Sequence, residues 1–189
     1  SSDLSIGSGL GTSDKSRRIL QATLENVEVP CVVDADGLNL LSAHSRYMKN
    51  LVRGQFIFTP HMKEMSRITR KSVEELRNSR MEILKQFAGE YDVTCVLKDA
   101  RTCIFSPGEH PFVNLSGNAA MAKAGSGDVL AGVITGLLAQ KMSCFDAAVL
   151  GVYLHGLAGD EAKREKGSYS VLARDLAENI GTVLKRLEE

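Results

Sequence analysis

The sequence predicts a layered α/β fold, in which helices flank a mainly parallel β-sheet. Four short apolar runs have the length of buried strands, and amphipathic segments with helical periodicity separate them. Turn residues and polar residues directly follow these runs. With only four prolines and no repeat or low-complexity segment to mark a linker, residues 1–189 are interpreted as a single domain.

The composition gives no reason to expect a nucleic-acid or membrane partner. Lys+Arg and Asp+Glu are equal at 23 each, and the 43% hydrophobic content allows a sizeable core. No apolar run is long enough to cross a bilayer, and the N-terminus lacks the regions of a signal peptide. The four cysteines show neither a C-x-x-C pair nor zinc-like spacing. We therefore expect a reduced, cytoplasmic, soluble protein.

The first strand is predicted at residues 4–6, and it runs into Gly7-Ser8-Gly9-Leu10-Gly11. This run fits a tight strand-to-helix turn at least as well as a phosphate loop. The helix expected from about Asp14 to Glu25 has an apolar face made of Ile19, Leu20, Thr23 and Leu24. A second strand at residues 29–33 ends in Asp34-Ala35-Asp36-Gly37, so Asp34 or Asp36 either caps the next helix or faces a ligand.

The third strand is predicted at residues 56–59, and Pro60 suits the start of the helix that follows. His61 and Glu64 then fall at the ligand-facing end of the sheet, where His61 is either a ligand residue or a partly exposed residue of the helix start. Residues 72–87 predict one amphipathic scaffold helix. Its inward residues are Val73, Leu76, Ile83, Leu84 and Phe87.

The fourth strand, at residues 93–97, ends at Lys98. A lysine in this position is usually solvated, but it also binds phosphate as an exposed point charge. Residues 103–105 and 112–113 are expected to form a small hairpin. Two helices, at residues 144–163 and 170–187, are expected to pack on the sheet, with His155 as a structural residue on an apolar face.

The stretch from Asn118 to Gln140 carries the most specific signal, because small residues end in Ala124-Gly125-Ser126-Gly127 and an apolar helix follows at once. Glycine lets the backbone come close to a ligand, and the free N–H groups and dipole of a helix start suit phosphate. Asp128 in the first turn is either an N-terminal cap or a proton-transfer group beside a bound anion.

These candidate polar residues all follow strands or open helices. In doubly wound sheets, ligands bind at this end of the strands. The concentration predicts a crevice for a nucleotide or another phosphorylated ligand, built around Gly9, Asp36, His61, Lys98, Asn118 and Asp128.

Five motifs extend this prediction: I-G-S-G-L-G, V-V-D-A-D-G-L-N-L-L, F-T-P-H-M-K-E-M-S-R, V-L-K-D-A-R-T and N-L-S-G-N-A-A-M-A-K-A-G-S-G-D-V-L-A-G-V-I-T-G-L-L-A-Q. In this order they resemble the ADP/ATP-dependent NAD(P)H-hydrate dehydratases, a branch of the ribokinase-like superfamily, over nearly the whole chain. The resemblance implies dehydration of the (6S)-hydrate of NADH or NADPH, driven by cleavage of ADP in bacterial members or ATP in eukaryotic ones. The T-P-H form around His61 resembles the bacterial type.

The resemblance also implies the site residues. It places the adenine nucleotide along Lys98, Asp99, Ala100, Arg101, Thr102, Asn118, Ala119, Ala120, Met121, Ala122, Lys123, Ala124, Gly125, Ser126 and Gly127. The hydrated cofactor is expected near Gly9, Gly11, His61, Glu64, Arg67 and Asp128, and the ligand-facing Asp36 is counted with them. Asp128 would be the reactive acid. Mg²⁺ is expected to accompany the phosphates, with no dedicated protein cage for it.

Three features depart from the family pattern. Ala124-Gly125-Ser126-Gly127 replaces the more usual G-G-T-G, and Asp99 stands where glycine is common. Family members also carry further strands and helices before the first glycine turn. We therefore expect an N-terminally truncated chain that associates with itself or with a complementary N-terminal fragment. Two other functions stay open: a ribokinase-like small-molecule kinase, and a nucleotide-binding module without turnover.

Overall fold

A six-stranded sheet in the order β1-β2-β3-β4-β5-β6 forms the centre of the computed structural model, which describes residues 3–188. The parallel strands are β1 (Leu4–Ile6), β2 (Cys31–Val33), β3 (Phe56–Phe58) and β4 (Thr94–Leu97). An antiparallel hairpin of β5 (Cys103–Phe105) and β6 (Phe112–Val113) extends the sheet. The predicted layered fold with a mainly parallel sheet is confirmed, and so is the hairpin.

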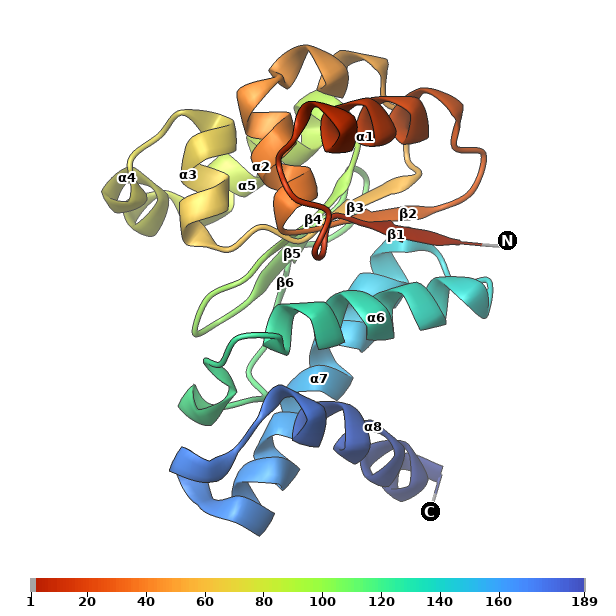
Figure 1. The fold of residues 1–189 in the computed structure, drawn as a ribbon. Helices are drawn as coiled ribbons and strands as arrows, with labels where there is room; N and C mark the ends of the chain where they lie inside the picture. The colour runs from red at the N-terminus through yellow and green to blue at the C-terminus, as the bar shows by residue number, and fades with distance from the viewer. Residues whose placement is uncertain (1–2, 189) are drawn as a thin grey trace.

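The helices that connect the parallel strands all cover one face of the sheet (Figure 1). They are α1 (Asp14–Asn26), α2 (Asp36–Ala43), α3 (Met62–Thr69), α4 (Val73–Asn78) and α5 (Arg80–Tyr91), with a 3₁₀ turn, η1, at Ser45–Asn50. Right-handed crossovers between strands in consecutive order place every connection on the same side. The strand order never reverses, so the sheet is not doubly wound.

The opposite face is covered by the C-terminal helices (Figure 1). After the 3₁₀ turn η2 (Ala119–Met121), α6 (Ser126–Ala139) and α7 (Cys144–Ser170) pack on the strands. In contrast, α8 (Ala173–Glu188) packs mainly on α7 and α6, where Leu176 and Val183 are buried. The expectation that α8 packs on the sheet is wrong, because α6 and α7 already fill that face. No helix among the described residues is long and apolar enough to cross a membrane.

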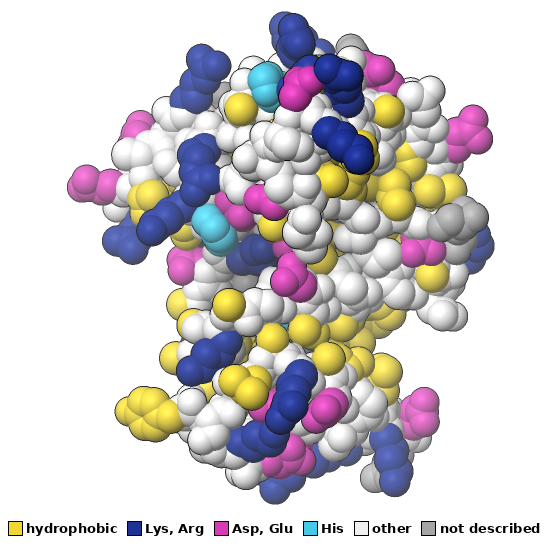
Figure 2. Space-filling view, in the orientation of Figure 1, with side chains coloured by type: hydrophobic (Ala, Val, Ile, Leu, Met, Phe, Trp, Pro, Cys, Tyr) yellow, Lys and Arg dark blue, Asp and Glu magenta, His cyan; other side chains and the backbone are white. Residues whose placement is uncertain are grey.

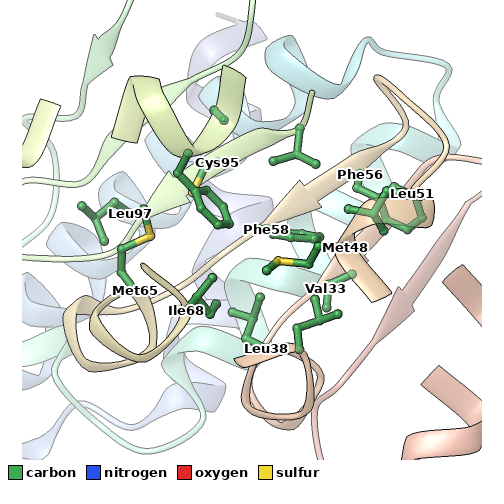
Figure 3. Packing of buried hydrophobic residues seen from close by; sticks show 14 of the residues in the cluster. Val33, Leu38, Met48, Leu51, Phe56, Phe58, Met65, Ile68, Cys95 and Leu97 are labelled. Carbon is green, nitrogen blue, oxygen red and sulfur yellow. The ribbon is translucent and has the colours of Figure 1, made fainter. Parts of the chain in front are cut away.

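The strands divide their side chains between two cores, as the period of two in a strand requires. Val33, Phe58 and Leu97 face the connecting helices, while Val32, Ile57 and Val96 face α6 and α7. Figure 3 shows the first core, in which residues of α2 and α3 point toward the strands. Both faces of the sheet are therefore buried, so we expect a ligand to bind at an edge of the sheet.

Two helix predictions need correction. The single helix expected at residues 72–87 is broken at Ser79, which has φ −127° and ψ 33°, so α4 and α5 are separate. Asn78 and Ser79 are poor helix formers, because their side chains compete for backbone hydrogen bonds. On α1, Leu20 and Leu24 are buried as expected, but Ile19 is 43% exposed and lies outside the buried face.

Candidate functional site

The parallel strands end at one edge of the sheet, where Asp34 follows β2 and Lys98 follows β4. Lys98 Nζ donates a hydrogen bond to Asp34 Oδ1 at 2.7 Å. The Asp34 side chain is 3% exposed and the Lys98 side chain 20%. The lysine is therefore not the exposed point charge that was expected. A buried carboxylate is costly without a cation, and Lys98 supplies that cation.

The start of α6 lies directly over this ion pair. Gly125 is the N-cap and has φ 87°, a left-handed conformation that favours glycine. A Cβ atom on Gly127 would lie 3.2 Å from Lys98 Nζ and 3.6 Å from Asp34 Oδ2. Glycine thus allows the first turn of α6 to bring its unpaired N–H groups close to a half-buried ammonium. Such a combination suits an anionic phosphate.

Asp128 is exposed in the first turn of α6. The helix begins from Gly125, and no side-chain hydrogen bond caps it. Asp128 is therefore not the N-cap residue, which was one of the two interpretations of this acid. The other interpretation, proton transfer beside a bound anion, matches its place directly after Gly127, in a helix start that suits an anion.

A second wall is formed by the loop before α6, which rests on glycines of α7. A Cβ atom on Gly156 would lie 2.0 Å from Ser116 Oγ, and one on Gly159 would lie 2.2 Å from Met121 Sδ. Ser116 Oγ also donates to the Tyr153 carbonyl at 3.1 Å. The sequence predicted only that this helix packs on the sheet, so its contact with the loop before α6 was not expected. Two glycines three residues apart on one helix face were the available signal.

His155 of α7 faces the same space and is 8% exposed. Its Nε2 lies 3.4 Å from the Oγ of Ser126 in the first turn of α6. Burial lowers the pKa of His155 to about 4, so the ring is neutral near pH 7. The interpretation as a purely structural residue is incomplete, because the imidazole also borders the cavity beside Lys98.

These elements line a cavity of about 990 Å³. Of the residues predicted at the nucleotide, all line it except Ala120, Ala124 and Gly125. Ala120 is instead packed against Ala162 and Leu176. Seven further residues that the sequence did not predict also line the cavity: Asn114, Ser116, Gly117, Leu130, Val152, His155 and Gly156.

Most of the residues predicted at the hydrated cofactor lie outside the cavity. Among the residues that the structure describes, His61 alone of that group lines the cavity. His61 caps α3: its Nδ1 accepts from the N–H groups of Lys63 and Glu64, at 3.1 Å each. Glu64 is buried, and its Oε2 accepts from the His61 N–H at 2.8 Å. Because Nδ1 acts as an acceptor, a neutral His61 ring would carry its proton on Nε2, which lies 3.4 Å from Glu64 Oε1.

The glycine turn after β1 is fixed by the turn after β2. Gly7 has φ 131°, and a Cβ atom there would lie 1.8 Å from the Asp34 carbonyl oxygen. Asp36 Oδ2 accepts from the Gly11 N–H at 2.8 Å. Asp36 therefore pins the glycine turn, and Ala35 is the N-cap of α2. Gly9 has open space where a Cβ atom would stand.

Arg67 and Asp99, two further predicted site residues, have partners within the protein. The Arg67 guanidinium donates to Asn39 Oδ1. Asp99 lies 3.2 Å from an Arg80 nitrogen, so this acid is paired at the rim of the cavity. Both pairs are exposed, and a ligand is therefore able to compete for either side chain.

Within residues 3–188, no group of three or more His, Cys, Asp or Glu side chains is placed to hold a metal ion. The four cysteines are unpaired. Burial raises the pKa of the Cys31 thiol to about 12, and it also raises that of Cys95. Both thiols are therefore protonated and inert, as expected for cysteines inside apolar runs.

Comparison with known proteins places this geometry in a family. The sequence model of NAD(P)H-hydrate dehydratase matches residues 2–182. A bifunctional NAD(P)H-hydrate repair enzyme of Moorella thermoacetica is 41% identical over 98% of this chain and 35% of that protein. An ADP-dependent (S)-NAD(P)H-hydrate dehydratase of Neisseria meningitidis is 40% identical over 91% of this chain and 59% of that protein. The chain thus spans only part of the length of these relatives.

The structural comparison agrees. An ADP/ATP-dependent NAD(P)H-hydrate dehydratase from Bacillus subtilis, co-crystallised with ATP/Mg²⁺, matches with TM-score 0.84 and 29% identity, over 98% of this chain and 64% of that chain. Ribokinase from Thermotoga maritima matches with TM-score 0.59 and 13% identity, over 97% of this chain and 56% of that chain, which shows the fold alone. The expected ribokinase-like fold is confirmed.

Proposed function

The chain belongs to the NAD(P)H-hydrate dehydratase family, and we propose that it removes water from hydrated NADH or NADPH at the expense of ADP or ATP. One observation carries the proposal. A single cavity of about 990 Å³ gathers most of the residues expected at the nucleotide and ends at the turn that bears Asp128. A cavity of this volume suits a ligand of nucleotide size.

In the proposed complex, the nucleotide phosphates lie at the first turn of α6, close to the Lys98 ammonium. The backbone N–H groups of this turn would hold the phosphate oxygens. The apolar lining of Met121, Leu130 and Val152 offers a surface for the adenine ring. Mg²⁺ arriving with the nucleotide would neutralise phosphate charge, and phosphate oxygens and water would supply its ligands, since no protein cluster is placed to do so in residues 3–188.

The hydrated cofactor would occupy the open side of the same turn, between Asp128 and the start of α3. Figure 2 shows Lys and Arg side chains gathered on the side of the molecule where α3 lies. Lys63, Arg67 and Arg70 are exposed in this segment. Their positive charge would attract the phosphates of a dinucleotide.

The proposed reaction has two steps. Asp128 accepts the proton of the hydrate hydroxyl while that oxygen attacks the terminal phosphorus of ADP, and the bond from that phosphorus to AMP breaks. The phosphorylated hydroxyl then leaves as inorganic phosphate with loss of a ring proton, which restores the double bond. Hydrated NADH and ADP thereby give NADH, AMP and phosphate.

The test is an assay of the chain with hydrated NADH, ADP and Mg²⁺. Absorbance at 340 nm should rise together with AMP and phosphate, in equal amounts. A phosphorylated product that accumulates without absorbance at 340 nm would identify a small-molecule kinase instead. ADP binding without any turnover would identify a nucleotide-binding module.

We also propose that the chain acts in association, either with a second copy or with a complementary N-terminal fragment. Among the described strands, β1 pairs with β2 alone, so its outer edge is free for another strand. The neighbouring α6 has open space beside Gly132 and Gly136, and Figure 2 shows hydrophobic side chains along this helix. Light scattering at several concentrations tests the proposal, and a fully active monomer would refute it.

A cytoplasmic location completes the proposal. Four unpaired cysteines suit a reducing compartment. Fractionation of the source cells, with the protein found in the cytoplasmic fraction, is the expected result.

A further inference from the structure

One carboxylate on α7 ties down the loop that forms a wall of the nucleotide cavity. Asp160 Oδ2 accepts from the Gly117 N–H at 2.9 Å. Its other oxygen, Oδ1, accepts from Asn118 Nδ2 at 2.8 Å. Hydrogen bonds to an ionised acceptor are about twice as strong as neutral ones. Asp160 lies 43 residues after Gly117 and 42 residues after Asn118, so these bonds join separate elements.

Both N–H donors of the Asn118 side chain are used by this arrangement. Its Nδ2 also donates to the Gly159 carbonyl at 3.0 Å, which uses both N–H bonds of the amide. Its Oδ1 accepts from the Ala120 N–H at 3.0 Å and so caps η2. Asn118 therefore shapes the cavity wall, and its amide has no further N–H for a nucleotide.

Gly117 makes the turn dependent on an external anchor. Its φ is 91°, and a Cβ atom would lie 2.9 Å from Met121 Sδ and 3.3 Å from Gly156 Cα. Only glycine fits here, yet glycine has no intrinsic preference for this conformation and loses the most backbone freedom on being fixed. The hydrogen bonds that Asp160 accepts from Gly117 and Asn118 hold the turn in this conformation.

The anchored wall also reaches the opposite side of the cavity. Arg101 Nη1 donates to the Leu115 carbonyl at 3.4 Å, which links the loop after β4 to the loop before α6. Both loops line the cavity. A displacement of the Gly117–Asn118 turn would therefore alter the width of the space between them.

We propose that Asp160 is a positioning residue for the adenine nucleotide, which holds the Gly117–Asn118 turn against α7 before the ligand arrives. The inference rests on the proposed function of the cavity. A wall that is ordered in advance spares the ligand the entropy of ordering it. Loss of the anchor should therefore weaken nucleotide binding and leave the hydrate side and the chemical step unchanged.

The experiment compares Asp160→Ala and Asp160→Asn with the wild type in the assembly in which the enzyme is active. Asp160→Ala should raise KM for ADP and the Kd from calorimetry about tenfold, the factor expected for one strong hydrogen bond. KM for the hydrate and kcat at saturating ADP should stay the same. Asp160→Asn keeps one acceptor but turns an amide N–H toward a donor, so its effect should be intermediate. Glu178→Ala, which removes an exposed acid from α8, is the matched control and should behave as wild type.

Hydrogen exchange of the Gly117 amide gives a readout that does not depend on activity. Exchange should be faster in Asp160→Ala, while amides in the sheet core keep their protection. Unchanged ADP affinity in Asp160→Ala would overturn the inference. An equal rise in KM for ADP and for the hydrate would also overturn it, because that result indicates a general loss of structure. If the wild type binds no ADP, the proposed function fails and the inference fails with it.

Discussion

The two sides of the candidate site are built in different ways. The proposed nucleotide side is a cavity whose walls are fixed by contacts between distant elements, such as Lys98 with Asp34 and Asp160 with Gly117. The proposed hydrate side is exposed, because the contacts of Asp36 with Gly11 and of Arg67 with Asn39 both lie at the surface. There, His61 caps its own helix.

Because of this difference, we expect some residues of the site to contribute to the stability of the fold and others to contribute only to the reaction. Side chains of the nucleotide side hold elements of the fold together, so their removal should lower the free energy of unfolding as well as nucleotide affinity. Asp128 lies exposed at the boundary of the two sides, so we expect its removal to leave the fold intact. Substitutions that affect one property and spare the other can test the comparison.

The largest effect is expected at the boundary. Asp128→Asn should lower kcat by roughly 10²–10⁴, the usual range for a lost acid–base group, with the Kd for ADP and the melting temperature unchanged. Steady-state kinetics measure kcat, and calorimetry measures the Kd and the melting temperature. Full activity combined with a lower melting temperature would instead assign Asp128 a role in stabilising the helix.

On the nucleotide side, Lys98→Ala should lower the free energy of unfolding by about 3 kcal/mol, because the Asp34 carboxylate would be left buried without a partner. The same substitution should weaken ADP binding, because it removes the ammonium beside the phosphates. Urea denaturation measures the first effect and calorimetry the second. The double variant Lys98→Ala with Asp34→Asn should recover most of the stability but none of the ADP affinity. Wild-type stability in the single variant would contradict a structural role of the pair.

Burial of His155, on the same side, predicts that the free energy of unfolding depends on pH. Its pKa in the folded protein is about 4, below the ordinary value of 6.5, chiefly because of burial. Between these values the unfolded state binds a proton that the folded state does not, so the free energy of unfolding should fall as pH drops from about 6.5 to about 4. The total loss is about 3 kcal/mol.

Urea denaturation across this range measures the slope, and His155→Gln should flatten it. Glu161 affects the free energy of unfolding in a separate, lower pH range. The Arg164 and Arg186 guanidinium groups lower its pKa to about 2, so its contribution is lost only as pH falls below about 4.5. Equal slopes in His155→Gln and wild type between pH 6.5 and 4.5 would show that His155 titrates normally.

The smallest effect is expected on the hydrate side. Asp36→Ala removes the acceptor of the Gly11 N–H and should raise KM for the hydrate about fivefold, which corresponds to one exposed hydrogen bond. Asp36→Asn keeps an acceptor oxygen and serves as the matched control. KM for ADP should not change in either variant. A rise in KM for ADP instead would mean that the glycine turn belongs to the nucleotide side.

The sequence by itself determined what depends on neighbouring residues. Short apolar runs predicted the parallel strands, the turns after them predicted a ligand edge, and the run Gly125-Ser126-Gly127-Asp128 predicted a helix start that suits an anion. These features follow from local sterics and from the orphan N–H groups of a helix end. They are therefore readable without the fold.

Only the tertiary structure decided which distant groups meet. Nothing around Lys98 shows that its partner is Asp34, 64 residues earlier, and nothing around His155 or Asp160 places them at a cavity. The sheet was predicted, but its one-sided connections were not, because handedness of crossover acts on the order of strands in space. Pairings between distant residues depend on packing the whole chain, and no local pattern encodes them.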